Sequence, residues 1–322
     1  MEKKDLRIVY MGTPDFAVPT LERLIEEGYN VVGVITMPDK PIGRHQSQLQ
    51  ASPVKECALK HDIPVLQPER LKDEVFLEEL RALRADLQIV VAFRMLPEAV
   101  WAMPRLGTFN LHAALLPQYR GAAPINWAII NGDKISGVTT FFLKHEIDTG
   151  DVIMRREVEI TEADDAGTLH DKLMLLGGET VVDTVKSIIR GEAVARTQAS
   201  IYDGELRPAP KIFRDTCRID WSKGCTELYN FVRGLSPYPA AWMEVSDANG
   251  TVTAVKVYET RKEQCEPSHP AGTLLTDGKG YVKVALTDGY LQLTSLQLPG
   301  KKRMPVADLL RGSSFEGLEV VK

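Results

Sequence analysis

Two polar residues stand together at the end of a strand-like run of the sequence. Asn110 and His112 close the run 106–112 and lie two positions apart. Side chains two apart on a strand project from the same face, and open α/β sheets place their sites beyond the carboxyl ends of the strands. This spacing therefore favours a shared site at the strand end. A histidine with a purely structural role is the alternative.

A second polar cluster follows the strand-like run 137–143. Residues 145–151 contain His145 and three acidic residues, among them Asp148. A carboxylate beside an imidazole favours the protonated form of the ring and fixes its tautomer. One of these carboxylates could therefore orient and charge His112. A solvated turn is the alternative interpretation.

The sequence contains only weak evidence for a dinucleotide-binding motif or a metal site. The turn Gly12-Thr13-Pro14 lacks the later glycines of the dinucleotide fingerprint, which favours a tight strand-to-helix turn. Several histidines are scattered along the chain without metal-ligand spacing, so we expect no metal site. They are His45, His61, His170 and His269.

Basic residues at two places could contact a polyanion. The polar loop 38–46 contains Arg44 and is either a basic finger for phosphate or a surface loop. The cluster Lys301-Lys302-Arg303 ends a strand-like run and could belong to one positive face, with solvated charges as the alternative. The other members of that face would be Lys211, Arg214, Arg218, Lys223 and Arg233.

The elements that would position these residues alternate between strand and helix in the first half of the chain. Such alternation predicts a parallel sheet with crossover helices. The predicted strands are 6–11, 31–36, 87–92, 106–112 and 137–143. The predicted helices are 16–27, 53–62, 74–84 and 168–190.

The second half of the chain has a different pattern. Residues 191–212 have little periodicity and contain Gly191, Gly204, Pro208 and Pro210, as linkers do. A helix near 222–234 follows, and then short strand-like runs separated by turns, which predict a small barrel. Those runs are 252–258, 281–286 and 290–296.

Length and composition agree with this division. The chain has 322 residues, of which 44% are hydrophobic and 26% charged, as in globular proteins of roughly two domains. Residues 1–205 carry 23 Lys and Arg against 31 Asp and Glu, whereas residues 206–322 carry 16 against 13. Halves of opposite sign could mean that one of them binds a polyanion such as nucleic acid.

Cysteine spacing and hydropathy indicate the compartment. The four cysteines form no C-x-x-C pair, which favours reduced thiols over a zinc ribbon or a redox site. No run approaches the roughly 18 apolar residues of a membrane span, and the first residues lead directly into a strand. We therefore expect a cytoplasmic protein.

Two stretches of the sequence resemble the signatures of a known family. Residues 110–125 (NLHAALLPQYRGAAPI) and 148–151 (DTGD) are similar to the two motifs of formyltransferases that use 10-formyltetrahydrofolate. Residues 11–17, 39–55 and 233–237, with Ala241-Trp242 and residues 300–304, resemble the branch of that family whose acceptor is initiator methionyl-tRNA. The resemblance covers essentially the whole chain.

The resemblance implies a fold and a division of labour. It implies a Rossmann-like catalytic domain at 1–190 that binds the folate, a linker at 191–210, and an OB-like barrel at 211–322 that binds tRNA. 10-Formyltetrahydrofolate would be the co-substrate and tetrahydrofolate a product, with no metal ion. Initiator methionyl-tRNA would be the acceptor. We expect a monomer with no membrane partner.

The resemblance also implies roles for single residues. Asn110 would donate to the oxyanion of the tetrahedral intermediate, His112 would shuttle a proton, and Asp148 would hold His112. Contacts with tRNA would come from Arg44 and the 301–303 cluster, that is Lys301, Lys302 and Arg303. Folate would contact Phe93, Arg94, Met95, Ala114, Leu115, Leu116 and Pro117.

The sequence departs from the family pattern at a few positions. Ala114 replaces the usual Ser, and Phe93-Arg94 replaces Tyr-Gly. His145-Glu146-Ile147 stands where Gly-Leu is usual, and His45 stands where Gly is common. These changes affect the folate-lining loop and the basic finger and leave the three candidate catalytic residues in place.

Other functions fit some of the same residues. An amino-sugar formyltransferase or a formyltetrahydrofolate hydrolase would share the Asn, His and Asp, but the Arg44 loop and the basic second half favour tRNA. A non-catalytic RNA-binding protein would not need these three residues together. An NAD-linked dehydrogenase is disfavoured by the missing glycine fingerprint.

Overall fold

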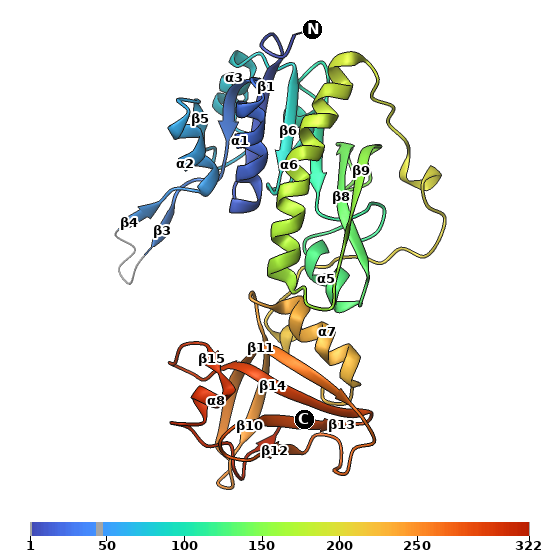
Figure 1. Cartoon of the computed structure of the whole chain (residues 1–322). Helices are drawn as coiled ribbons and strands as arrows, with labels where there is room; N and C mark the ends of the chain where they lie inside the picture. The colour runs from blue at the N-terminus through green and yellow to red at the C-terminus, as the bar shows by residue number, and fades with distance from the viewer. Residues whose placement is uncertain (1, 43–47, 322) are drawn as a thin grey trace. The chain divides into compact units, whose positions relative to one another are not determined.

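The computed structural model describes residues 2–42 and 48–321 (Figure 1). The chain forms two compact units, and each unit collects several stretches of sequence. The first unit comprises residues 1–121, 136–158 and 170–208, and the second comprises 122–135, 159–169 and 209–322. The predicted linker spans residues 191–210. Its residues 191–208 belong to the first unit.

Seven strands form the central sheet of the first unit. They are β1 (Arg7–Gly12), β2 (Asn30–Ile35), β5 (Val65–Leu66), β6 (Leu87–Val91), β7 (Thr108–His112), β8 (Ile135–Phe142) and β9 (Val152–Glu159). Their order is β5-β2-β1-β6-β7-β8-β9, with parallel neighbours from β5 to β7 and with β8 antiparallel to β7. This sheet confirms the predicted Rossmann-like, mostly parallel architecture.

Helices pack on both faces of this sheet (Figure 1). They are α1 (Val18–Glu26), α2 (Pro53–Lys60), α3 (Glu74–Ala82), α4 (Glu98–Trp101) and α6 (Ala166–Arg190), with 3-10 turns η1 (Asp15–Ala17) and η2 (Gln198–Ser200). Helix α6 lies close to β7, since a Cβ on Gly177 would be 2.6 Å from the Leu111 side chain. On the other face, Phe76 and Leu80 of α3 join Val9 of β1 in one buried cluster.

Local signals explain where two of these helices begin. The Ser52 hydroxyl accepts a hydrogen bond from the Lys55 backbone N–H at 3.1 Å and caps α2, whose first residue is Pro53. The Asp73 carboxylate caps α3 in the same way. Such caps satisfy backbone donors that have no partner inside the helix. The strands β3 (Lys40–Ile42) and β4 (Gln48–Gln50) form a separate short antiparallel pair.

The second unit contains a nearly closed antiparallel barrel. Its strands are β10 (Ala241–Ser246), β11 (Val252–Gln264), β12 (Leu274–Thr276), β13 (Val282–Leu286), β14 (Gly289–Gln297), β15 (Met304–Pro305) and β16 (Glu319–Val320). The order is β12-β13-β14-β11-β10-β16, with β15 paired to β14. The predicted small, OB-like barrel is confirmed.

Helices complete the second unit. They are α5 (Pro124–Ile130), α7 (Cys225–Leu235) and α8 (Val306–Leu309), with the 3-10 turn η3 (Asp215–Cys217). Leu228 and Val232 of α7 are fully buried against barrel residues such as Val257 and Leu291. The helix α7 therefore forms part of the core of this unit.

Two further properties concern the described part of the chain. None of its helices combines the length and apolar character that crossing a lipid bilayer requires. Within residues 2–42 and 48–321, no group of His, Cys, Asp and Glu side chains is arranged to hold a metal ion. The four cysteines are free thiols, and Cys265 is the exposed one.

Candidate active site

Asn110 and His112 occupy the carboxyl end of β7, as their spacing predicts. β7 lies between the parallel strand β6 and the antiparallel strand β8, and His112 is paired in register with Thr139. The His112 side chain is buried and Asn110 is half-buried. In the described part of the chain, no residue forms a hydrogen bond with the Asn110 side chain. Its amide is therefore available to a substrate.

The two ring nitrogens of His112 face different partners. Nε2 lies 2.8 Å from the Tyr119 carbonyl oxygen, and Nδ1 lies 3.9 Å from Oδ2 of Asp148. A carbonyl oxygen can only accept, so the proton of a neutral ring must be on Nε2. Nδ1 is then free to accept a proton, and the imidazolium so formed faces the Asp148 carboxylate. This arrangement suits a general base.

Asp148 is held in an uncommon backbone conformation. Its φ is +54°, in the left-handed region that non-glycine residues rarely adopt. Its Oδ2 accepts a hydrogen bond of 3.0 Å from the backbone N–H of Gly121, in the loop that follows β7. The carboxylate is thus fixed by the chain segment that also carries the partner of His112.

Gln198 is a residue of this site that the sequence analysis missed. Its side chain is 3% exposed, and Nε2 donates to the carbonyl oxygens of Asp148 at 2.7 Å and of Gly150 at 2.9 Å. Its Oε1 accepts two hydrogen bonds from the Arg120 guanidinium. Gln198 therefore joins the Asp148 loop to the loop after β7. No periodicity marks it, because it lies in an irregular segment 48 residues beyond Gly150.

Gly150 is required by close packing at the same turn. A Cβ at this position would lie 1.6 Å from the carbonyl oxygen of Phe142. Phe142 ends β8 and its N–H donates to the Asp151 carbonyl at 3.0 Å. The turn that presents Asp148 can close on β8 only with glycine here.

The residues expected to line the folate after β7 are firmly held. The Thr139 hydroxyl donates to the Ala114 carbonyl at 2.6 Å and accepts from the Leu116 N–H at 3.0 Å. Arg155 donates to the Leu116 carbonyl. The side chains of Ala114, Leu116 and Pro117 are buried and that of Leu115 is half-buried. Any ligand at this stretch would therefore meet mainly backbone atoms and Leu115.

The other predicted folate residues follow β6. Arg94 donates to the backbone carbonyls of Pro68 and Glu69, and burial lowers the pKa of its guanidinium. Its guanidinium also lies 5.7 Å from the centre of the Phe93 ring. Met95 is 70% exposed. Arg94 therefore anchors this loop, and Met95 projects from it into solvent.

The predicted tRNA contacts have different surroundings. Arg44 lies outside the described residues. Arg303 donates to Glu259 and to the Ser295 hydroxyl, and Lys301 bonds the Ser313 hydroxyl at 2.9 Å. Lys302 is exposed. Two of the three basic side chains of the 301–303 cluster thus carry charge that no carboxylate of the described chain neutralises.

Arg233 does not belong to the predicted positive face. It is buried in the second unit, where it donates to Asn230 and to the carbonyls of Thr161 and Asp164. Its guanidinium lies 5.4 Å from the centre of the Tyr229 ring. The prediction is wrong here because sequence alone does not separate a buried structural arginine from a surface one.

Comparison with known proteins identifies two matching family models and many full-length relatives. Residues 6–185 match the formyl transferase model, and residues 211–314 match the formyl transferase C-terminal domain. A methionyl-tRNA formyltransferase from Parabacteroides distasonis is 63% identical over 314 residues, which are 97% of each chain. One from Flavobacterium johnsoniae is 54% identical over 98% of each chain.

Solved structures share the fold at low sequence identity. An N-formyltransferase from Helicobacter canadensis, in complex with folinic acid and dTDP-3-aminofucose, has a TM-score of 0.66 and 19% identity. That match covers 89% of this chain and 98% of the other. HypX from Aquifex aeolicus in complex with tetrahydrofolic acid has a TM-score of 0.62 and 21% identity over 95% of this chain and 47% of its own.

Proposed function

This chain belongs to the formyl transferase family, and we propose that it transfers a formyl group from 10-formyltetrahydrofolate to the α-amine of initiator methionyl-tRNA. The proposal of methionyl-tRNA as the acceptor is based on the high identity, along nearly the whole chain, to relatives named methionyl-tRNA formyltransferase. The presence of both matched domains supports it further. The product would be formylmethionyl-tRNA for translation initiation.

The proposed chemistry uses Asn110, His112 and Asp148. The amine nitrogen attacks the formyl carbon, and the carbonyl electron pair moves to oxygen as the C–N bond forms. The free Asn110 amide donates to that oxyanion. Nδ1 of His112 accepts the proton that the amine loses, and Asp148 faces the resulting imidazolium. The oxyanion then collapses, the bond to the folate nitrogen breaks, and that nitrogen takes up the proton that His112 has held.

The proposed division of labour follows the two domains. Residues 1–190 would bind the folate and hold the three catalytic residues, residues 191–210 would link the domains, and residues 211–322 would bind tRNA. The folate contacts proposed are Leu115, Met95 and the backbone of the stretches around them. The tRNA contacts proposed are Arg44, Lys301 and Lys302, with Arg303 tied to Glu259.

A direct assay tests the acceptor. The protein is incubated with methionine-charged initiator tRNA and 10-formyltetrahydrofolate, and formylmethionine is released from the tRNA and detected. Formylmethionine formed in proportion to enzyme supports the proposal. Formate release without formylmethionine would identify a hydrolase, and formylation of an amino sugar in place of the tRNA would identify the sugar branch.

A further inference from the structure

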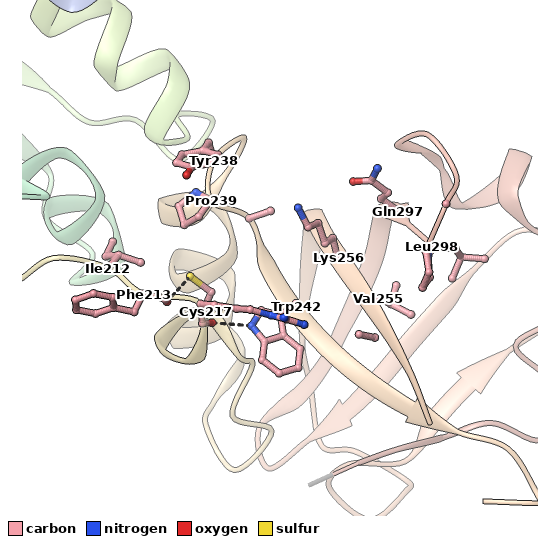
Figure 2. Close-up of a pocket in the computed structure, with 15 residues that line it drawn as sticks. Ile212, Phe213, Cys217, Tyr238, Pro239, Trp242, Val255, Lys256, Gln297 and Leu298 are labelled. Atoms are coloured by element: carbon pink, nitrogen blue, oxygen red, sulfur yellow. Dashed lines mark hydrogen bonds between the residues drawn. The ribbon is translucent and has the colours of Figure 1, made fainter. Parts of the chain in front are cut away.

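The second unit carries a pocket of about 590 Å³ on its barrel (Figure 2). Trp242, Lys256 and Gln297 lie directly opposite one another on β10, β11 and β14. Their strand neighbours, such as Met243, Val255 and Leu296, are buried in the barrel core, so this row faces outward. An aromatic ring, a cation and an amide therefore line one outer face of the sheet.

Exposed aromatic side chains complete the pocket. Phe213 is 61% exposed and Tyr238 is 83% exposed, and both line it. Among the exposed large hydrophobic residues of the described chain, they are the two most exposed aromatics. In Figure 2, Phe213 lies at one end of the pocket, Gln297 and Leu298 lie at the other, and Trp242 and Lys256 lie between them. Large aromatic surface left in water at one place is typical of a binding site.

The charge around this pocket is positive and unneutralised. The Lys211 ammonium lies 5.5 Å from the Phe213 ring centre, and the Arg214 guanidinium lies 5.5 Å from the Trp242 ring. In the described chain, no carboxylate pairs with Lys211, Arg214 or Lys256. None of the fifteen lining residues is acidic.

Elsewhere in the same unit, basic side chains are commonly paired. Carboxylates pair with Arg218, Lys223, Lys262, Lys283 and Arg303. The pocket thus concentrates cations that lack an internal partner, which favours an anionic ligand.

We propose that this pocket binds an unpaired nucleotide of the RNA substrate, with its base against the exposed aromatic rings and its phosphates beside Lys211, Arg214 and Lys256. Every base has a π-face, and aromatic rings with nearby cations bind single-stranded nucleic acid. The phosphates of a duplex would also contact the cations, but its bases stack on one another and would not stack on the aromatic rings. The inference rests on the proposed function, which supplies the RNA.

Binding experiments on the full-length protein separate the rings from the charges. The probes are an eight-nucleotide single-stranded RNA and a duplex of the same sequence, titrated without folate. We expect Phe213→Ala to weaken binding of the single strand by about tenfold, because stacking on one ring is lost. We expect duplex binding to change by less than twofold. Phe213→Tyr keeps a ring and should retain single-strand binding.

A matched control and a second variant guard against misfolding. Tyr202→Ala removes a 41% exposed aromatic side chain that does not line the pocket, and it should leave single-strand binding unchanged. Lys256→Ala should weaken single strand and duplex alike, because it removes charge. Equal binding of the single strand by the wild-type protein and Phe213→Ala would overturn the proposal. Binding of a hexaglutamate peptide, lost in Phe213→Ala while RNA does not bind, would overturn it as well.

Kinetics separate this inference from the proposed function. With initiator methionyl-tRNA, Phe213→Ala should raise the KM for tRNA with little change in kcat, since the pocket belongs to the second unit whereas Asn110 and His112 belong to the first. Formylation with an unchanged KM would overturn the pocket and leave the function standing. Failure to formylate, with single-strand binding that still depends on Phe213, would overturn the function and support the pocket.

Discussion

His112 is the residue whose surroundings say most about the chemistry. Its Nε2 faces the Tyr119 carbonyl, so in the proposed mechanism Nδ1 accepts the proton and Asp148 supplies the counter-charge. Asp148→Asn removes that charge at nearly constant shape. We expect a fall of about 100-fold in kcat/KM for methionyl-tRNA, measured with folate in excess, and a similar fall for Asn110→Ala and His112→Ala.

A neighbouring acid is the control for the Asp148 substitution. Glu146 is exposed in the same loop, and Glu146→Gln should keep kcat/KM within twofold. Near-wild-type activity of a folded Asp148→Asn protein, with chemistry limiting the rate, would remove Asp148 from the mechanism. Equal losses in Asp148→Asn and Glu146→Gln would instead indicate a general effect of charge in the loop.

We expect Gln198 to act as a positioning residue, because its side chain holds the Asp148 loop and Arg120. Gln198→Ala leaves the carbonyls of Asp148 and Gly150 without their donor, which costs about 1–3 kcal/mol for each buried group. The Asp148 loop can then relax from its positive φ. We expect kcat to fall at least tenfold, with a smaller change in KM, in a steady-state assay across pH.

The accepting and donating halves of the Gln198 amide can be tested separately. Gln198→Glu keeps an acceptor for Arg120 but offers no donor to the two carbonyls, so it should lose as much activity as Gln198→Ala. Gln118→Ala is the control, since Gln118 bonds Glu205 and Arg207 and not the Asp148 loop. A purely structural role would lower the melting temperature and leave the pH profile of kcat unchanged.

At the scale of elements, the turn between β8 and β9 determines where Asp148 lies. Gly150→Ala would place a methyl group 1.6 Å from the Phe142 carbonyl oxygen, so the turn must open. We expect a lower melting temperature and loss of most activity, measured by thermal unfolding and the formylation assay. Gly312→Ala is the control, because a Cβ there meets open space. An active, equally stable Gly150→Ala protein would contradict this account of the turn.

Sequence reasoning predicts the elements that are buried on both faces. The runs of β1, β6 and β7 are recognisable because most of their residues are buried, as expected for central strands covered on both faces. β9 was missed because its sequence VIMRREVE contains four charges and, at the sheet edge, alternates mostly half-buried and exposed positions. β10 was missed because AWMEVS alternates buried and half-buried positions on the barrel.

The candidate site was predictable where spacing along one strand carries the signal. Asn110 and His112 share β7, and the resemblance added Asp148. Gln198 was not predictable, because its partners lie 48 and more residues away and only folding brings them together. The pocket lined by Phe213 and Lys256 was missed for the same reason, since its walls come from strands and loops of distant sequence.

At the scale of the whole molecule, charge separates the two halves of the chain. The net charge is −8 over residues 1–205 and +3 over residues 206–322, so the second half is the part that can attract tRNA phosphates. The structure refines this picture, because much of that positive charge is already paired within the unit. We therefore expect the residues that contact RNA phosphates to be those without a carboxylate partner.

This distinction divides the 301–303 cluster, and salt dependence can test it. Each phosphate contact contributes about −0.9 to the slope of log K against log salt for duplex nucleic acid. Lys301 and Lys302 are not neutralised, so the double substitution to Ala should flatten the slope by about two, measured with tRNA between about 50 and 200 mM salt. Arg303→Ala should change it little, because Glu259 already holds that guanidinium.

Lys279→Ala, at an exposed turn of the same unit, is the control. An unchanged slope in the double variant would withdraw the cluster from tRNA binding, and an equal effect of Arg303→Ala would mean that Glu259 releases the arginine when tRNA binds.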